Sequence, residues 1–234
     1  MTTHRNIEKP PHKTKEQQNT TKRSMKKTHL SAIAAALLLS VGLSSCSETS
    51  EDTSEFDNWQ ERNEAYFQQK YQEAVAKGQQ ADAFVLTKWS LNDSIANKAE
   101  DHIVVEVLED GDGIESPMYT DSVTVHFRGR TIPTSASPEG YIIGSSYEGT
   151  FYDATSLPRT LSMTSATTND GLATALQRMH VGDRWKIYIP YQLGYGESAY
   201  TSSSTTEWLS ASIPAYTTLV FDVKLAGFKR PNAQ

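Results

Sequence analysis

The alternation of apolar and polar side chains along Ser122–Arg130 limits the fold of this chain more than any other feature. Val123, Val125 and Phe127 fall on one side of an extended segment, and the polar residues between them fall on the other. A period of two is typical of a β-strand with one buried face. We therefore predict a strand here, with His126 on the polar side, as a surface or strand-side histidine.

Four further segments favour strands, and one favours a helix. The strand candidates are 103–108, 159–163, 185–189 and 219–225. Apolar residues recur at helical spacing from Leu172 to Met179, with Asn169 or Asp170 before them as the capping residue. A turn is expected at 109–113 and a long loop at 191–217. Mostly strands with one short central helix predict an α+β domain with an antiparallel sheet.

The region ahead of this domain predicts one amphipathic helix. Aromatic and alanine residues recur at spacings of three and four from Phe56 to Val75, and Gly78 stands near the expected C-terminal end. We interpret the aromatic stripe as a packing face. Residues 79–100 stay ambiguous.

The N-terminal region is typical of an exported lipoprotein. Lys26 and Lys27 precede an apolar run of about a dozen residues, which is a signal-peptide pattern and too short to span a bilayer. Leu-Ser-Ser-Cys at 43–46 resembles a bacterial lipobox, so Cys46 is predicted to be lipidated; a buried core cysteine is the alternative. Met25 is a candidate for the true start. The expected order is a leader (1–45), an acidic tether (46–55), a helical N-terminal segment (56–100), the main domain (101–229) and a tail (230–234).

Charge and composition exclude several functions. Residues 1–45 hold eight basic and two acidic residues, which leaves 14 basic against 26 acidic residues and a net charge of −12 for the rest. A chain with so negative a charge after residue 45 is a poor candidate for binding nucleic acid. Cys46 is the sole cysteine, which excludes an internal disulfide and a cysteine-based zinc site. The three histidines after residue 45 lie far apart in the sequence. The Gly-x-Ser-x-Gly motif, which is typical of serine hydrolases, is absent from the sequence. No metal, cofactor or nucleophile is predicted.

Four segments in a fixed order resemble the FKBP-type peptidyl-prolyl isomerases, the macrolide-binding immunophilins. They are Val-His-Phe-Arg-Gly at 125–129, Leu-Gln-Arg-Met-His-Val-Gly-Asp at 176–183, Ile-Tyr-Ile-Pro-Tyr-Gln-Leu-Gly-Tyr-Gly at 187–196, and Ile-Pro-Ala-Tyr-Thr-Thr-Leu-Val-Phe-Asp-Val at 213–223. The lipoprotein layout is similar to that of family members in Bacteroidetes-type bacteria. The resemblance implies a five- to six-stranded antiparallel half-barrel wrapped around one short helix, with a pocket between them. It also implies rotation of X-Pro amides without a metal or cofactor.

The resemblance assigns the following pocket residues. Phe127 and Phe221 match aromatic walls, Tyr195 matches the tyrosine whose hydroxyl bonds the substrate carbonyl, and Ile213 matches the residue that closes over the proline ring. These four are the predicted catalytic residues. The predicted substrate-binding positions are Ile143, Gly144, Thr168, Asn169 and Leu172.

Some of these positions depart from the family pattern. Leu172 replaces the tryptophan of the pocket floor, and Thr168-Asn169 replaces a Val-Ile pair. The family aspartate falls on Gly144, which we favour, or on Asp153 in a second alignment. The sequence therefore predicts a lipid-anchored prolyl isomerase of the outer membrane that acts on proline-containing polypeptides. The alternative is a catalytically weak or inactive module that binds a protein or glycan in the same cleft.

Overall fold

The computed structural model describes residues 54–78, 82–151, 154–165, 168–201, 209 and 212–231. The leader, the lipidation of Cys46, most of the acidic tether and Asp153 as the pocket aspartate are predictions that lie outside these residues. No helix of the described part is both long and apolar enough to cross a membrane.

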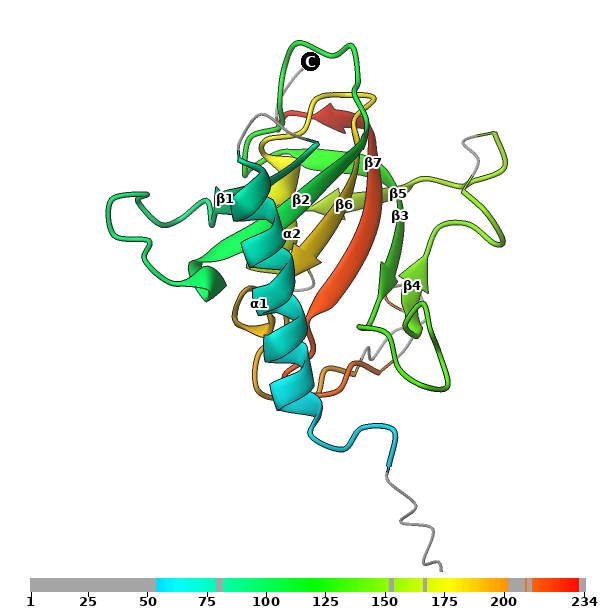
Figure 1. Ribbon diagram of the computed structural model, residues 1–234. Coiled ribbons are helices and arrows are strands. Elements are labelled where there is room, and N and C mark those ends of the chain that lie inside the picture. Colours follow the sequence, from blue (N-terminus) through cyan, green and yellow to red (C-terminus); the bar gives the residue numbers. More distant parts are fainter. Residues whose placement is uncertain are drawn as a thin grey trace, which may run out of the picture. The chain divides into compact units, whose positions relative to one another are not determined.

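The elements follow one another in the order shown in Figure 1. They are α1 (Trp59–Lys77), β1 (Ala83–Thr87), the 3-10 helix η1 (Ala99–Asp101), β2 (His102–Glu109), β3 (Ser122–Arg130), β4 (Ile142–Ser145), β5 (Arg159–Ser162), α2 (Asp170–Leu176), β6 (Arg184–Ile189), the 3-10 helix η2 (Tyr191–Leu193) and β7 (Leu219–Lys229).

All pairings in the sheet are antiparallel. The strand order is β1-β2-β6-β7-β3-β4, and β5 extends the sheet from β3. This arrangement confirms the predicted α+β class. The sheet is wider than expected because β1, from the ambiguous region, adds an edge strand beside β2. The segment 56–100 is therefore not helical throughout.

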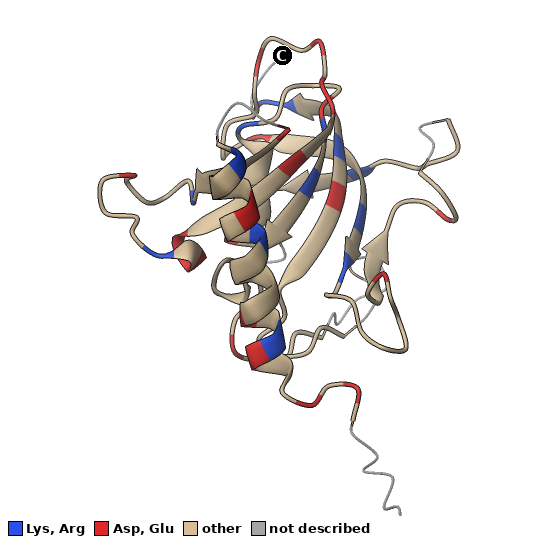
Figure 2. Ribbon diagram, in the orientation of Figure 1, with Lys and Arg blue, Asp and Glu red and all other residues tan. Residues whose placement is uncertain are grey.

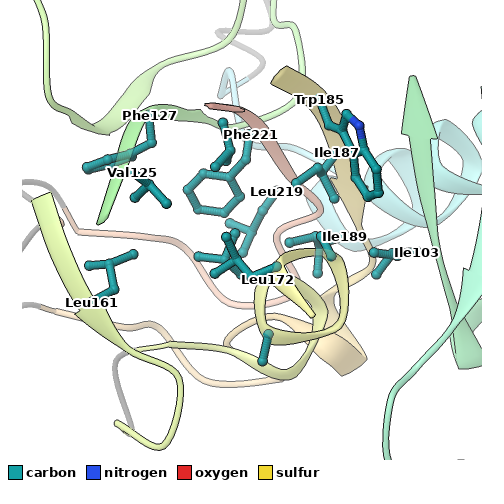
Figure 3. Close-up of a cluster of buried hydrophobic side chains, with 14 of the residues drawn as sticks. Ile103, Val125, Phe127, Leu161, Leu172, Trp185, Ile187, Ile189, Leu219 and Phe221 are labelled. Atoms are coloured by element: carbon teal, nitrogen blue, oxygen red, sulfur yellow. The ribbon is translucent and has the colours of Figure 1, made fainter. Parts of the chain in front are cut away.

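The inner face of the sheet holds the main core, and α2 packs on it (Figure 3). The odd-numbered residues from 185 to 189 of β6 and from 219 to 225 of β7, such as Ile187 and Phe221, belong to this core and are buried. Gly171 lets α2 approach the sheet closely, because a Cβ at this position would overlap Ile189 Cγ2. Asn169 caps α2 as predicted: its Oδ1 accepts a hydrogen bond from Leu172 N at 2.9 Å.

The outer face carries α1, as the aromatic stripe predicted. Phe67 and Ala74 are buried against Val104, Tyr188 and Val220, which are the outward neighbours of inner-face residues. The helix ends at Gly78, whose positive φ of 75° is a backbone angle that glycine adopts without strain.

Asn63 links α1 to the strand that follows the long loop. Its side chain is fully buried; Nδ2 donates to Trp59 O at 2.7 Å, and Oδ1 accepts from Thr218 N at 2.7 Å. Trp59 Nε1 donates to Thr217 Oγ1 at 3.0 Å. The start of β7 is thus fixed by the helix.

Two details differ from simple expectation. His126 lies on the outer face, as predicted, but it is only 8% exposed, because the loop after β4 covers it and Ser156 Oγ lies 2.7 Å from its Nδ1. Glu55, placed in the tether, is held instead by hydrogen bonds from Thr134 Oγ1 and Tyr141 OH, which lower the pKa of its carboxyl.

Candidate active site

The residues assigned to a substrate pocket come from five separate parts of the chain and meet in the inner core. Phe127 lies on β3, Phe221 on β7, Ile143 on β4, Leu172 in the first turn of α2, and Ile213 in the loop before β7; all belong to one apolar cluster. Figure 3 shows Phe127, Phe221 and Leu172 converging between the sheet and the helix. Residues distant in sequence thus form one apolar cluster.

These side chains are covered in the present conformation. Phe221 is 0% exposed, Phe127, Ile143 and Ile213 are each 1% exposed, and Leu172 is 2% exposed. Leu209, from the long loop, is 1% exposed and joins the same cluster. The sequence analysis missed Leu209 because residues 201–212 are mostly Ser and Thr and show no period of apolar residues.

Because Gly129 has no side chain, the Phe221 ring can approach β3 closely. A Cβ at Gly129 would overlap Phe221 Cε1 and would lie 3.0 Å from Ile143 Cγ1. Gly144 is buried and pairs with Gly129 in the β3–β4 register. Gly144 therefore lies on the strand beside Phe127; because Asp153 is outside the described residues, the choice between the two alignments stays a prediction.

Tyr195 lies at the margin of the cluster and is half-buried. Gly196, with φ of 79°, follows it in the left-handed region and donates from N to Tyr191 O at 2.9 Å, which returns the chain toward η2. The ring of Tyr195 stacks on Tyr200 with centroids 4.4 Å apart and an interplanar angle of 28°. Tyr195 thus has a packing role, which the sequence analysis did not anticipate.

Tyr200 joins Tyr195 to the loop that carries Ile213. Tyr200 N donates to Ile213 O at 2.9 Å, and Ile213 N donates to Tyr200 O at 2.8 Å. Sequence reasoning missed Tyr200, although a second tyrosine five residues after Tyr195, in a loop of small residues, is a usable signal.

Thr168 and Asn169 are buried just ahead of α2, and their side chains form hydrogen bonds that fix the chain at the start of this helix. Thr168 Oγ1 donates to Ser162 O at 2.9 Å. Since Asn169 Oδ1 caps the helix, the orientation of the amide is fixed, and its Nδ2 is a buried donor that has no hydrogen-bond partner among the described residues. A buried amide donor without a partner is rare in folded proteins.

The arrangement can favour one conformation of a substrate through its apolar surface and through hydrogen bonds. The cluster is made of apolar side chains, with tyrosines at its margin. No group of three or more His, Cys, Asp or Glu side chains within the described ranges is suited to hold a metal ion.

Comparison with known proteins identifies related sequences. A family model described as FKBP-type peptidyl-prolyl cis-trans isomerase matches residues 113–226. The chain is 31% identical to the macrophage infectivity potentiator of Trypanosoma cruzi, over 57% of this chain and 57% of that protein. It is 30% identical to the FKBP-type 22 kDa peptidyl-prolyl cis-trans isomerase of Escherichia coli (strain K12), over 70% of this chain and 66% of that protein.

A third relative is named for its location. The outer membrane protein MIP of Legionella longbeachae is 27% identical, over 72% of this chain and 60% of that protein. In each of these three comparisons the match spans less than two thirds of the relative's length.

Proposed function

We propose that this chain, which belongs to the FKBP-type peptidyl-prolyl cis-trans isomerase family through residues 113–226, catalyses rotation about X-Pro amide bonds in polypeptides. The observation that carries the proposal is the Tyr195–Tyr200 stack, joined by backbone hydrogen bonds to Ile213 at the margin of the aromatic cluster.

Rotation about an amide bond breaks no covalent bond, so it requires neither a nucleophile nor a metal ion. The barrier to amide rotation is about 18–20 kcal/mol, because the planar amide is stabilised by resonance. The twisted amide has lost that resonance and carries less charge separation, so a dry apolar site favours it over the planar form. Each 1.4 kcal/mol of this preference accelerates rotation about tenfold.

Tyr195 is proposed to bind the substrate at the exposed side of the cluster. Its ring and that of Tyr200 are half-exposed, whereas Phe127 and Phe221 are covered, so a proline ring first contacts the tyrosine stack. The Tyr195 hydroxyl then donates a hydrogen bond to the carbonyl that rotates. Phe127, Phe221 and Ile213 supply the apolar surroundings, together with Ile143 and Leu172.

Asn169 is proposed to supply a second donor. Its Nδ2 is buried beside the first turn of α2, the same turn that places Leu172 in the cluster. A substrate carbonyl that accepts from this amide removes the cost of leaving a buried donor unpaired. The replacement of an apolar residue by Asn169 therefore adds a hydrogen bond to the site.

The decisive experiment measures refolding of a protein whose slow phase is limited by proline isomerisation. We expect acceleration by the full chain, a loss of about tenfold in kcat/KM for Tyr195→Phe, and no change for Tyr119→Phe, a tyrosine stacked on Trp89 instead. Asn169→Asp keeps an acceptor for Leu172 N and removes the donor, so it is expected to lower kcat/KM while the helix cap persists.

A second candidate function is binding without catalysis. It is favoured by the near-complete burial of Phe127 and Phe221, and by Leu172 at the floor position. A folded chain that binds a proline peptide but gives no acceleration would support this function and reject the first.

The proposal places the protein in the cell envelope, anchored through lipid on Cys46, where its substrates are exported polypeptides. Support comes from the lipobox at 43–46 and from a relative that is named an outer membrane protein. Metabolic labelling with a fatty acid, compared between the full chain and Cys46→Ser, tests this; label in both forms would contradict it.

A further inference from the structure

A groove lies on the outer face of the sheet, opposite to the candidate active site. It has a volume of about 580 Å³ and runs between α1 and the loop that follows β4. Its floor comes from β3, β6 and β7, and Pro133 and Pro138 of the β3–β4 connection close one end. We call it the outer-face groove.

The outer-face groove gathers four basic side chains. Arg128 and Arg130 stand on β3, and Arg184 and Lys186 stand on β6; Asp222 and Glu139 are the acidic lining residues. Figure 2 shows basic residues on β3 and β6. This concentration stands out because the chain outside residues 1–45 has a net charge of −12.

The two acidic residues are already engaged. Asp222 accepts from Arg184 through both oxygens, at 2.8 and 2.7 Å. Glu139 pairs with Arg130 at 3.0 Å and is otherwise exposed to solvent. These pairs neutralise Arg184 and Arg130.

Arg128 and Lys186 have no carboxylate partner among the described residues. The guanidinium of Arg128 donates only to neutral oxygens: Gly149 O at 2.8 Å, Tyr147 O at 2.9 Å and Ser145 Oγ at 3.2 Å. Lys186 Nζ lies 5.7 Å from the ring centre of Tyr188 and forms no ion pair in the described part. Asp222 lies opposite both residues in the strand register, and Glu106 lies opposite Lys186, but neither carboxylate forms an ion pair with them, so both cations are available to a further carboxylate.

Aromatic rings hold the two guanidinium groups in place. Arg128 lies 4.1 Å above the Tyr147 ring, and Arg184 lies 4.2 Å above the Phe151 ring. Stacking of this kind reduces the side-chain entropy lost on binding and offers apolar surface next to charge. Tyr66 of α1 lines the other wall.

We propose that the outer-face groove binds an extended acidic segment of a polypeptide partner, with carboxylates paired to Lys186 and Arg128 and apolar side chains against Tyr147, Phe151 and Tyr66. A groove with basic side chains on two strands and aromatic walls fits a peptide better than a single small anion. The groove lies across the sheet from Tyr195, so a chain bound there leaves the candidate active site free.

The test is fluorescence anisotropy of a labelled twelve-residue peptide that alternates Glu with Leu and Tyr, titrated with the full chain. The matched control peptide has Gln in place of Glu. We expect the acidic peptide to bind more tightly by about tenfold or more, with an affinity that falls as salt rises. Equal binding of the two peptides, or no binding by the folded protein, would overturn the proposal.

Two charge-matched variants locate the site. Lys186→Glu is expected to weaken binding about tenfold, and Lys229→Glu, an exposed strand lysine at the far end of β7, is expected to leave it unchanged. Equal losses would indicate a general charge effect and contradict the groove. Tyr195→Phe is expected to have no effect on this binding. If vesicles containing anionic lipid bind in a Lys186-dependent manner and the peptide does not, a membrane surface replaces the peptide as the ligand.

Discussion

The two faces of the sheet are built from alternate residues of the same strands, yet they differ in chemistry. On β7, Phe221 is fully buried in an aliphatic and aromatic core, while its neighbour Asp222 forms an ion pair in the outer-face groove. On β6, Ile187 and Lys186 repeat this contrast. Strand alternation alone therefore separates the apolar cluster, proposed to receive a neutral amide, from the charged groove, proposed to receive carboxylates.

The largest expected effect tests whether the inner face carries the stability. Phe221→Ala removes a fully buried ring, so the free energy of unfolding should fall by about 3–5 kcal/mol. Asp222→Asn, one residue away, breaks a partly exposed ion pair and should cost about 1 kcal/mol or less. Urea denaturation measures both, and similar losses would show that the two faces do not differ in this way.

A smaller effect tests how tightly the inner face is packed. Gly129→Ala forces a Cβ against the Phe221 ring and should lower the free energy of unfolding by about 1–3 kcal/mol. Gly227→Ala on β7 is the control, because a Cβ there meets no atom within 4 Å. Equal thermal stability of the two variants would refute the close approach of Phe221 to Gly129.

The Asn63 contact tests the comparison of the two faces, because it lies on the outer side of the sheet and is polar, yet it is fully buried. Asn63→Ala leaves Thr218 N without its acceptor, so a loss of about 1–3 kcal/mol is expected. Asn63→Asp keeps the side-chain volume and that acceptor but sets a buried carboxylate oxygen against Trp59 O, so it should be at least as destabilising, whereas Gln69→Ala, on the exposed side of α1, should be nearly neutral. Chemical denaturation of the three variants distinguishes a hydrogen-bonding role from simple loss of volume.

The smallest effect concerns the charges on the outer face. A hydrogen bond from Lys224 Nζ at 2.9 Å, aided by Arg184, lowers the pKa of Glu109 in the folded chain. A lowered folded pKa means that this contribution to stability is present above the unfolded pKa and disappears as pH falls through the folded pKa.

Because the Glu109 side chain is 42% exposed, Glu109→Gln should cost less than about 1 kcal/mol at pH 7. The difference from the unaltered chain should shrink toward zero as the pH falls through the lowered folded pKa of Glu109, as measured by urea denaturation at each pH. A difference that stays constant across this range would mean that Glu109 contributes through packing instead.

The sequence was sufficient to predict an element where buried residues recur at the period of a strand or a helix. Residues 122–130 form β3 over the predicted range, and the helix predicted from Phe56 to Gly78 is α1. β1 and β4 were not predicted, because each is short and its burial depends on the strand beside it. Ile142–Ser145 becomes a strand through pairing with β3, which no local pattern encodes.

The clustering of the candidate site residues was predicted in part. Motif resemblance selected Phe127, Phe221 and Ile213, which the fold brings into one cluster. Tyr200 was missed because its role arises from stacking and from pairing with residue 213. The outer-face groove was also missed, because the closeness of Arg128 to Lys186 depends on both strands pairing with β7 at Asp222.

The most direct test of the central claim is two-dimensional NMR exchange spectroscopy of a short proline-containing peptide with the isotope-labelled full chain. Faster exchange between the cis and trans signals of the peptide is expected, with amide shift changes in the protein concentrated at 193–200 and 212–216 rather than around the outer-face groove. Exchange at the uncatalysed rate in the presence of folded protein, or shift changes confined to the outer face, would contradict the account.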